Sequence, residues 1–143
     1  MRDNEENAMV EVFNPEGIPA PVGPYSQVAI GPSDRRVAHI AGQVAVDDSG
    51  DIVGVGDFRV QCRQALANLD RVVTAIGGTF EDVVYVRGYL RRAADLPAYR
   101  EERERFYREA TPNRPPPTTT LVVSALYHPD CLVEIDAVAM LAS

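Results

Sequence analysis

The chain has 143 residues, about the length of one domain, and its 45% hydrophobic and 24% charged residues are typical of a folded globular protein. Its formal net charge of −7 disfavours a nucleic-acid-binding protein that depends on general attraction to phosphate groups. All 14 basic residues are arginine, which excludes chemistry that needs a lysine amine, such as a pyridoxal Schiff base or a P-loop.

The cysteines and histidines limit the chemistry further. Cys62 and Cys131 lie far apart, so neither a disulfide framework nor a cysteine-based zinc site is expected. Two histidines, His39 and His128, are too few for a multi-histidine metal site.

No apolar run approaches the roughly 20 residues of a membrane span. The polar, acidic N-terminus does not resemble a signal peptide. We therefore expect a cytoplasmic protein that does not enter a membrane.

In chain order, residues 1–9 are predicted to form a disordered tail, because they are polar and have little to bury. Residues 10–143 are predicted to form a single domain. Within it, residues 14–24 hold four prolines and two glycines, which favours irregular chain. Segments rich in β-branched residues predict strands at 10–13, 26–30, 37–46, 83–91, 118–127 and 132–141.

Two segments between these strands have the periodicity of amphipathic helices. Residues 58–76 carry apolar side chains at i, i+3, i+4 and i+7, with Asp57 as the expected N-cap and a glycine pair after them. The second helix is expected to start near Asp95, and Arg103 interrupts its apolar stripe. The element order predicts a two-layer α+β domain, in which both helices pack on one face of a mixed sheet.

The last predicted strand carries two carboxylates, Glu134 and Asp136, on one face, because side chains alternate along a strand. One interpretation is a strand face that simply meets solvent. The other is a carboxylate that orients or deprotonates a water molecule, which is a common task of such groups in hydrolytic sites. The strand alone does not decide between them.

Three further features have both a structural and a functional interpretation. Tyr25 follows a Gly-Pro turn, so it either packs on the sheet or lines a pocket. Gly42, inside a strand, indicates a bulge or a close approach of another group to the backbone. The arginine-rich stretch 91–114 is expected to form surface ion pairs, and the alternative is an anion site made by Arg100 or Arg103.

The chain as a whole resembles the RidA/YjgF family of reactive-intermediate deaminases, whose members are often labelled endoribonuclease L-PSP or translation inhibitors. The resemblance extends from about residue 12 nearly to the end and rests on four segments in the right order and spacing: GPYSQ, AGQVAVD, QALANLDRVVTAIGGTFEDVVYVRGYL and LVEIDAVAML. It implies a chorismate-mutase-like fold and a homotrimer with a small-molecule pocket in each cleft between subunits. It also implies hydrolysis of 2-imino or enamine acids to 2-oxo acids and ammonia, without a metal or organic cofactor.

The resemblance also assigns roles to single positions. Glu134 falls at the glutamate that positions water, Tyr25 at the pocket tyrosine and Gly42 at the glycine whose backbone contacts the ligand. Thr118 stands where the family has a signature arginine that grips the substrate carboxylate, and Thr120 matches a small or cysteine position facing the same way. A threonine hydroxyl offers one neutral hydrogen bond in place of a charged, two-pronged contact.

Three other arginines are candidates to replace that grip. Arg114 is four residues upstream of Thr118, roughly 13 Å away in extended chain. Arg87 and Arg100 would have to reach from a neighbouring subunit.

Three functions follow as hypotheses. The first is hydrolysis of an imine or enamine with altered substrate recognition. The second is a trimeric small-molecule-binding protein that does not deaminate. The third is RNA cleavage or translation inhibition, which the net charge of −7 and the lack of lysine disfavour.

Overall fold

A computed structural model describes residues 10–17, 19–21, 25–112 and 114–142 of the chain. The predicted tail, residues 1–9, lies outside this range. The described part contains a four-stranded sheet in the order β3-β6-β4-β5 and a separate two-stranded sheet of β1 and β2. Their bounds are β1 Glu11–Phe13, β2 Val28–Ile30, β3 Arg36–Gln43, β4 Val83–Leu90, β5 Thr118–Val122 and β6 Val133–Leu141.

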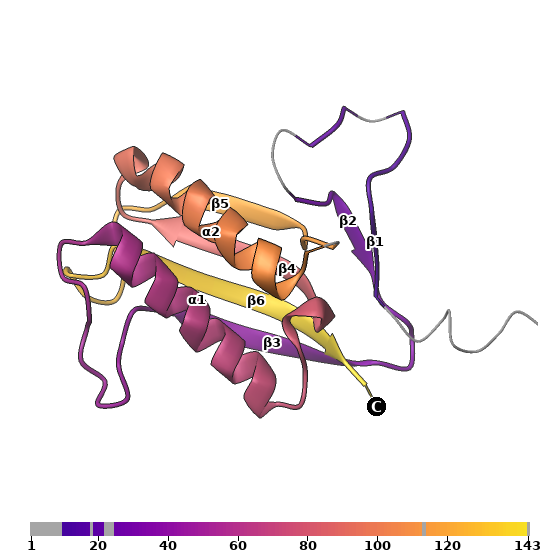
Figure 1. Cartoon of the computed structure of the whole chain (residues 1–143), viewed down its shortest axis with the longest axis horizontal. Helices are drawn as coiled ribbons and strands as arrows, with labels where there is room; N and C mark the ends of the chain where they lie inside the picture. Colours follow the sequence, from indigo (N-terminus) through magenta and orange to yellow (C-terminus); the bar gives the residue numbers. More distant parts are fainter. Residues whose placement is uncertain (1–9, 18, 22–24, 113, 143) are drawn as a thin grey trace, which may run out of the picture.

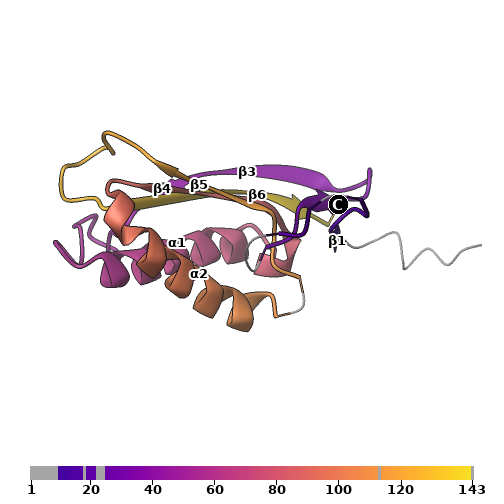
Figure 2. The same cartoon turned by 90° about the horizontal axis from the view of Figure 1, so that it is seen from above.

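Two α-helices, α1 (Phe58–Ala75) and α2 (Leu96–Ala110), cover one face of the four-stranded sheet and leave the other face without a helix (Figures 1 and 2). We refer to the helix-free side as the open face. The sheet is mixed, because β4 pairs in parallel with β5 and antiparallel with β6. The predicted two-layer α+β architecture is therefore confirmed, and it is the fold of the solved relatives described below.

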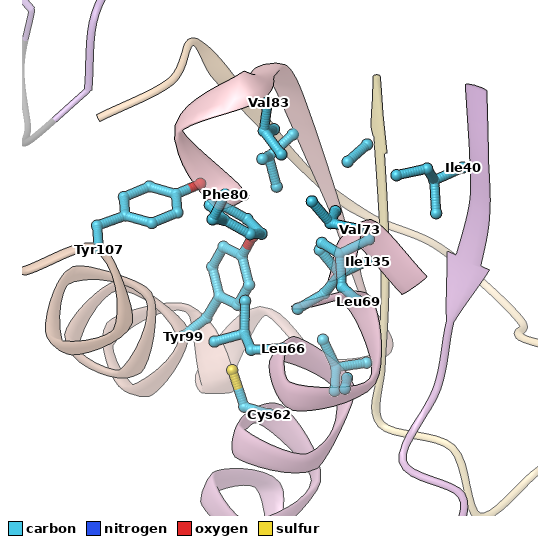
Figure 3. Close-up of a cluster of buried hydrophobic side chains, with 14 of the residues drawn as sticks. Ile40, Cys62, Leu66, Leu69, Val73, Phe80, Val83, Tyr99, Tyr107 and Ile135 are labelled. Atoms are coloured by element: carbon cyan, nitrogen blue, oxygen red, sulfur yellow. The ribbon is translucent and has the colours of Figure 1, made fainter. Parts of the chain in front are cut away.

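The hydrophobic core lies between the helices and the sheet (Figure 3). It forms because the apolar stripe of α1, including Cys62, Leu66 and Leu69, meets alternate side chains of β6 such as Ile135. Asp57 caps α1 as predicted, since its side chain accepts a hydrogen bond from the backbone N–H of Val60. Among the described residues, no helix is long and apolar enough to cross a membrane.

Two strands end several residues earlier than the sequence predicts. The fifth was predicted over 118–127 but ends at Val122, because its only partner, β4, ends at Leu90 and offers no further backbone to pair with. The third was predicted over 37–46 but ends at Gln43, after the register with β6 shifts between Ile40 and Gln43. The chain then leaves the sheet.

Candidate functional site

The open face of β6 carries the two carboxylates that the alternation predicts. Glu134 and Asp136 are half-buried there, while Val133, Ile135 and Ala137 are buried on the helix side. β6 is a central strand, with β3 on one side and β4 on the other. Each carboxylate therefore has two neighbouring strands from which partners can come.

Asp136 is held by side chains of β4. The guanidinium of Arg87 donates from Nε and Nη2 to the two carboxylate oxygens, at 2.9 and 3.1 Å. The hydroxyl of Tyr89 donates to Oδ2 at 2.8 Å. Partial burial and this hydrogen bond both raise the pKa of Tyr89, so the phenol remains a donor. The charge and most of the hydrogen-bonding capacity of Asp136 are thereby used inside the protein.

Glu134 has a different environment. Within the part of the chain that the structure describes, no cation lies within ion-pair distance of its carboxylate. Its side chain lies against the backbone of Gly42, where a Cβ atom would come within 2.2 Å of Glu134 Oε1. Gly42 sits in the irregular part of β3, so the predicted bulge and the predicted close approach both occur at this position.

Tyr25 precedes a strand that lies outside the four-stranded sheet. It is half-buried and precedes β2, and the pair of β1 and β2 lies beyond the C-terminal end of β6 (Figure 1). Glu134 is the second residue of β6, at the opposite end. Within one chain, Tyr25 therefore adjoins the two-stranded sheet, while Glu134 belongs to the four-stranded sheet.

The three threonines that start β5 divide between the two faces. The side chains of Thr118 and Thr120 lie on the helix side, where Thr118 Oγ1 is buried and Thr120 Oγ1 accepts a long hydrogen bond of 3.4 Å from Arg103. Thr119 lies on the open face, with its hydroxyl 2.6 Å from that of Tyr85. Thr118 and Thr120 do face the same way, but in one chain they lie across the sheet from Glu134.

The three arginines that were candidates to bind the substrate carboxylate in place of the family's arginine are not brought to Glu134 as free cations within one chain. Arg87 lies on the open face but is paired with Asp136. Arg114 donates to the backbone carbonyl of Val10 at 3.0 Å. Arg100 is exposed on α2, in the helix layer, and is not brought near Glu134 within the chain.

The sequence reasoning did not single out Tyr89 as a partner of the second carboxylate. The signal was present in the alternation of the β4 segment, which puts Tyr85, Arg87 and Tyr89 on one face. Sequence alone does not tell which residue of β6 lies opposite each of them. The described residues contain no group of three or more His, Cys, Asp or Glu side chains placed to hold a metal ion.

The protein is a small α+β domain, and the open face of its sheet carries a glutamate that forms no ion pair among the described residues. The sequence profile of the Endoribonuclease L-PSP family matches residues 16–141, and the chain belongs to this family. It is 33% identical over 129 residues to "3-aminoacrylate deaminase RutC" of Acinetobacter baylyi, covering 90% of this chain and 96% of that protein. It is 30% identical over 124 residues to "2-iminobutanoate/2-iminopropanoate deaminase" of Dermatophagoides farinae, covering 86% and 90%.

The comparison with solved structures agrees. The Rid-family protein YyfB of Yersinia pestis, described as of unknown function, superposes with a TM-score of 0.81 at 37% identity, covering 92% of this chain and 98% of that one. The RidA/YjgF resemblance is therefore confirmed, and the family includes proteins named as deaminases of small imino and amino acids.

Proposed function

We propose that this protein hydrolyses a reactive imine or enamine to a carbonyl compound and ammonia, with Glu134 positioning the attacking water. The observation that carries the proposal is the carboxylate of Glu134, which lies over Gly42 on the open face without an ion pair among the described residues. A carboxylate whose charge is not used inside the protein is available to accept a hydrogen bond from water. The deaminase names of two relatives supply the reaction class.

The reaction needs few groups. Water adds to the electrophilic carbon of the C=N bond, and the proton it loses ends on nitrogen. The resulting carbinolamine then breaks its C–N bond, so ammonia leaves and a C=O bond forms. An enamine first takes a proton on carbon and loses one from nitrogen, which gives the imine. Glu134 would hold the water and accept its proton during the addition, and the Gly42 backbone would border the same space.

Substrate recognition would differ from that of relatives with an arginine at the start of β5. None of Thr118, Thr119 and Thr120 carries a charge, so this strand offers at most neutral hydrogen bonds to a substrate carboxylate. From this region the open face presents Thr119 and Tyr85, and Thr119 lies opposite Arg87 on the neighbouring strand. We therefore propose a substrate whose anionic group is absent or is bound by another side chain, and Arg100 of a neighbouring copy is the candidate for that role.

The pocket would be completed by other copies of the chain in a homotrimer. The open face has no helix covering it, and it includes the exposed side chain of Val37. Tyr25 precedes β2 of the two-stranded sheet, whereas Glu134 lies on β6 of the four-stranded sheet, and the proposed pocket would take the two residues from different chains. Sedimentation or light scattering would measure the mass in solution. A monomer at micromolar concentration would contradict this part of the proposal.

The deciding experiment measures ammonia release from freshly generated imines, with a buffer blank because these compounds also hydrolyse spontaneously. Substrates would include 2-iminobutanoate, 3-aminoacrylate and a neutral imine of similar size. We expect acceleration that is lost in Glu134→Gln. If folded wild-type protein binds one of these ligands but accelerates none of the reactions, the result contradicts the proposed deaminase activity.

A matched pair of variants tests the recognition step. Thr119→Arg would place a guanidinium on the face of Glu134, whereas Thr118→Arg would place it on the buried helix side. We expect Thr119→Arg to raise kcat/KM for 2-iminobutanoate about tenfold, in line with one charge-assisted contact. Thr118→Arg should instead lower the melting temperature. Equal activity of Thr119→Arg and wild type would contradict the assignment of this face to the substrate.

The second candidate is a small-molecule-binding protein without deaminase activity. The neutral threonines at the start of β5 favour it, because a substrate carboxylate would lose its charged partner. Tight binding of a ligand that neither wild type nor Glu134→Gln converts would support this candidate. RNA cleavage is not proposed, since a net charge of −7 opposes binding to a polyanion.

A further inference from the structure

Arg103 is a buried cation in the helix layer. It interrupts the apolar stripe of α2, and only 5% of its surface is exposed. The guanidinium lies 5.3 Å above the ring of Tyr99 and donates its long hydrogen bond to Thr120. Nε of Arg103 is buried and has no hydrogen-bond partner among the described residues. Removing a guanidinium from water is costly unless a compensating anion or a full set of acceptors receives it.

No carboxylate of the described chain neutralises this charge. Arg103 forms no ion pair there, and the adjacent acid, Glu102, is already bound to Arg59 and Arg63. Arg63 donates from Nε and Nη2 to Glu102 at 2.8 and 2.9 Å, and Arg59 donates from Nη1 at 3.1 Å. Of the two acids that flank Arg103 in the sequence, Glu102 therefore serves two other cations, and Glu104 pairs with Arg108 at 3.6 Å.

The other titratable groups beside Arg103 are neutral. Burial raises the pKa of Tyr99 to about 12 and that of the Cys62 thiol to about 12. Burial also raises the pKa of Tyr107. Each of these groups stays protonated near neutral pH, so none supplies the missing negative charge.

Several hydroxyl groups gather around the same place without completed hydrogen bonds. The oxygens of Tyr99, Tyr107 and Thr118 are buried and make no hydrogen bond of good geometry within the described part of the chain, although Tyr99 interacts with Thr120 and Tyr107 with Thr118. The phenol rings of Tyr99 and Tyr107 extend from α2 towards the sheet (Figure 3). Tyr99 lies directly over Gly88 of β4, where a Cβ atom would come within 2.2 Å of the hydroxyl oxygen. Unpaired buried donors in such number are rare in folded proteins.

We propose that Arg103 and the surrounding hydroxyl groups of Tyr99, Tyr107 and Thr118 bind a small oxyanion, such as a carboxylate or phosphate. A guanidinium supplies paired N–H donors that match two oxygens of such a group, and neutral hydroxyls add further donors. The hydroxyls can turn towards one another, but only an anion also compensates the charge.

A small cavity at the end of α2 borders one residue of the site. Its volume is about 100 Å³, and its lining residues are Glu104, Tyr107, Arg108, Thr111, Pro112 and Pro115. Such a space holds a few water molecules or a small oxyanion. The site is separate from Glu134, because Arg103 lies on the helix side and Glu134 on the open face. The proposal therefore does not depend on the proposed reaction.

The test compares the wild-type protein with Arg103→Met, which keeps the side-chain length and removes the charge. The melting temperature would be followed as acetate or phosphate is added at constant ionic strength. We expect a saturable rise in the wild type, of about 4 °C at ten times the dissociation constant. Arg103→Met should show no rise, and without added anion it should melt no lower than the wild type. Arg105→Met, on the exposed side of α2, should respond like the wild type.

A second variant covers the case in which Arg103→Met does not fold. Tyr107→Phe keeps the cation and removes one hydroxyl, so it should weaken anion binding about two- to tenfold in a calorimetric titration with phosphate. Identical responses of wild type, Arg103→Met and Tyr107→Phe to both anions would overturn the proposal. A response to acetate but not phosphate would identify the ligand as a carboxylate, and the reverse would identify a phosphate.

Discussion

Two carboxylates stand two residues apart on the same face of β6, and their environments are opposite. Asp136 accepts three hydrogen bonds from Arg87 and Tyr89, whereas Glu134 has no ion pair among the described residues and rests on Gly42. The difference arises from the neighbouring strands. β4 offers a guanidinium to Asp136, while β3 offers Glu134 only the backbone of a glycine.

The side-chain directions sharpen this contrast. Tyr89 is the residue of β4 directly opposite Glu134, but its hydroxyl donates to Asp136 instead. Glu134 is thus left with its acceptor oxygens available on the open face. The comparison teaches that strand alternation identifies which carboxylates share a face, while the cross-strand partners determine which of them is available for chemistry.

The largest expected effect is the loss of activity in Glu134→Gln. The amide keeps the shape of the side chain and removes the base, so kcat/KM for imine hydrolysis should fall about 10²- to 10⁴-fold. Because Glu134 forms no ion pair with any residue that the structure describes, the free energy of unfolding should change by no more than about 0.5 kcal/mol. Ammonia release and denaturant titration would measure the two quantities.

Activity and stability together make that result decisive. If Glu134→Gln loses several kcal/mol of stability and keeps its activity, the two carboxylates have been assigned the wrong roles. Asp136→Asn, on the same strand and face, is the matched control.

The next largest effect is expected for Gly42→Ala. A Cβ atom there would lie 2.2 Å from Glu134 Oε1, so the carboxylate must move away from its present position. A displacement of about 1 Å lowers the rate of a positioned reaction by about 10²-fold. Steady-state kinetics on the accelerated substrate would measure this loss.

The double variant Gly42→Ala/Glu134→Gln shows whether the glycine acts through the glutamate. If it does, the double variant should be no less active than Glu134→Gln alone, because the displaced carboxylate is already gone. Losses that multiply would mean that Gly42 contributes in another way, for instance through its own backbone.

Much of this arrangement could be predicted from the sequence, because periodicity reports burial directly. The helix at Phe58–Ala75, its cap at Asp57 and the shared face of Glu134 and Asp136 all follow from side-chain spacing. Gly42 was informative for a similar reason, since a glycine inside a strand has few structural explanations.

The remainder depends on contacts between strands. Thr118, Thr119 and Thr120 are identical, so no alternation reveals which of them faces the helices, and only the register with β4 decides it. The early end of β5 has the same origin, because the length of β4 limits it. Arg103 appeared as an interruption of an apolar stripe, but its burial depends on how α2 packs on the sheet.

A third carboxylate, Glu102, is paired with two arginines, and its effect on stability should depend on pH. Hydrogen bonds from Arg63 and Arg59 hold its pKa below the ordinary value of 4.5. The hydrogen bonds between ionised Glu102 and the two arginines stabilise the fold above about pH 4.5. This stabilisation is lost as the pH falls through the lowered pKa of Glu102. Glu102→Gln should therefore lower the unfolding free energy by about 1–2 kcal/mol at pH 7.

Stability profiles from pH 7 to pH 3 would check this. The wild type should lose more stability on acidification than Glu102→Gln, so the two curves should converge at low pH. Glu101→Gln, whose carboxylate is exposed and binds Arg59 alone, should keep the wild-type slope. Parallel curves for wild type and Glu102→Gln would contradict the pKa direction.

The smallest effect is expected for Asp136→Asn, and it separates structural from catalytic carboxylates. The amide removes the charged acceptor of Arg87, but that guanidinium is nearly half exposed and water can solvate it. The unfolding free energy should therefore fall by only about 0.5–1 kcal/mol. Tyr89→Phe, which removes one hydrogen bond to the same carboxylate, should lower the unfolding free energy by a similar amount or less.

The activity of Asp136→Asn should fall far less than that of Glu134→Gln, because Asp136 has its hydrogen bonds within the protein. A loss of activity in Asp136→Asn as large as that in Glu134→Gln, with the fold intact, would mean that the two carboxylates act as one unit.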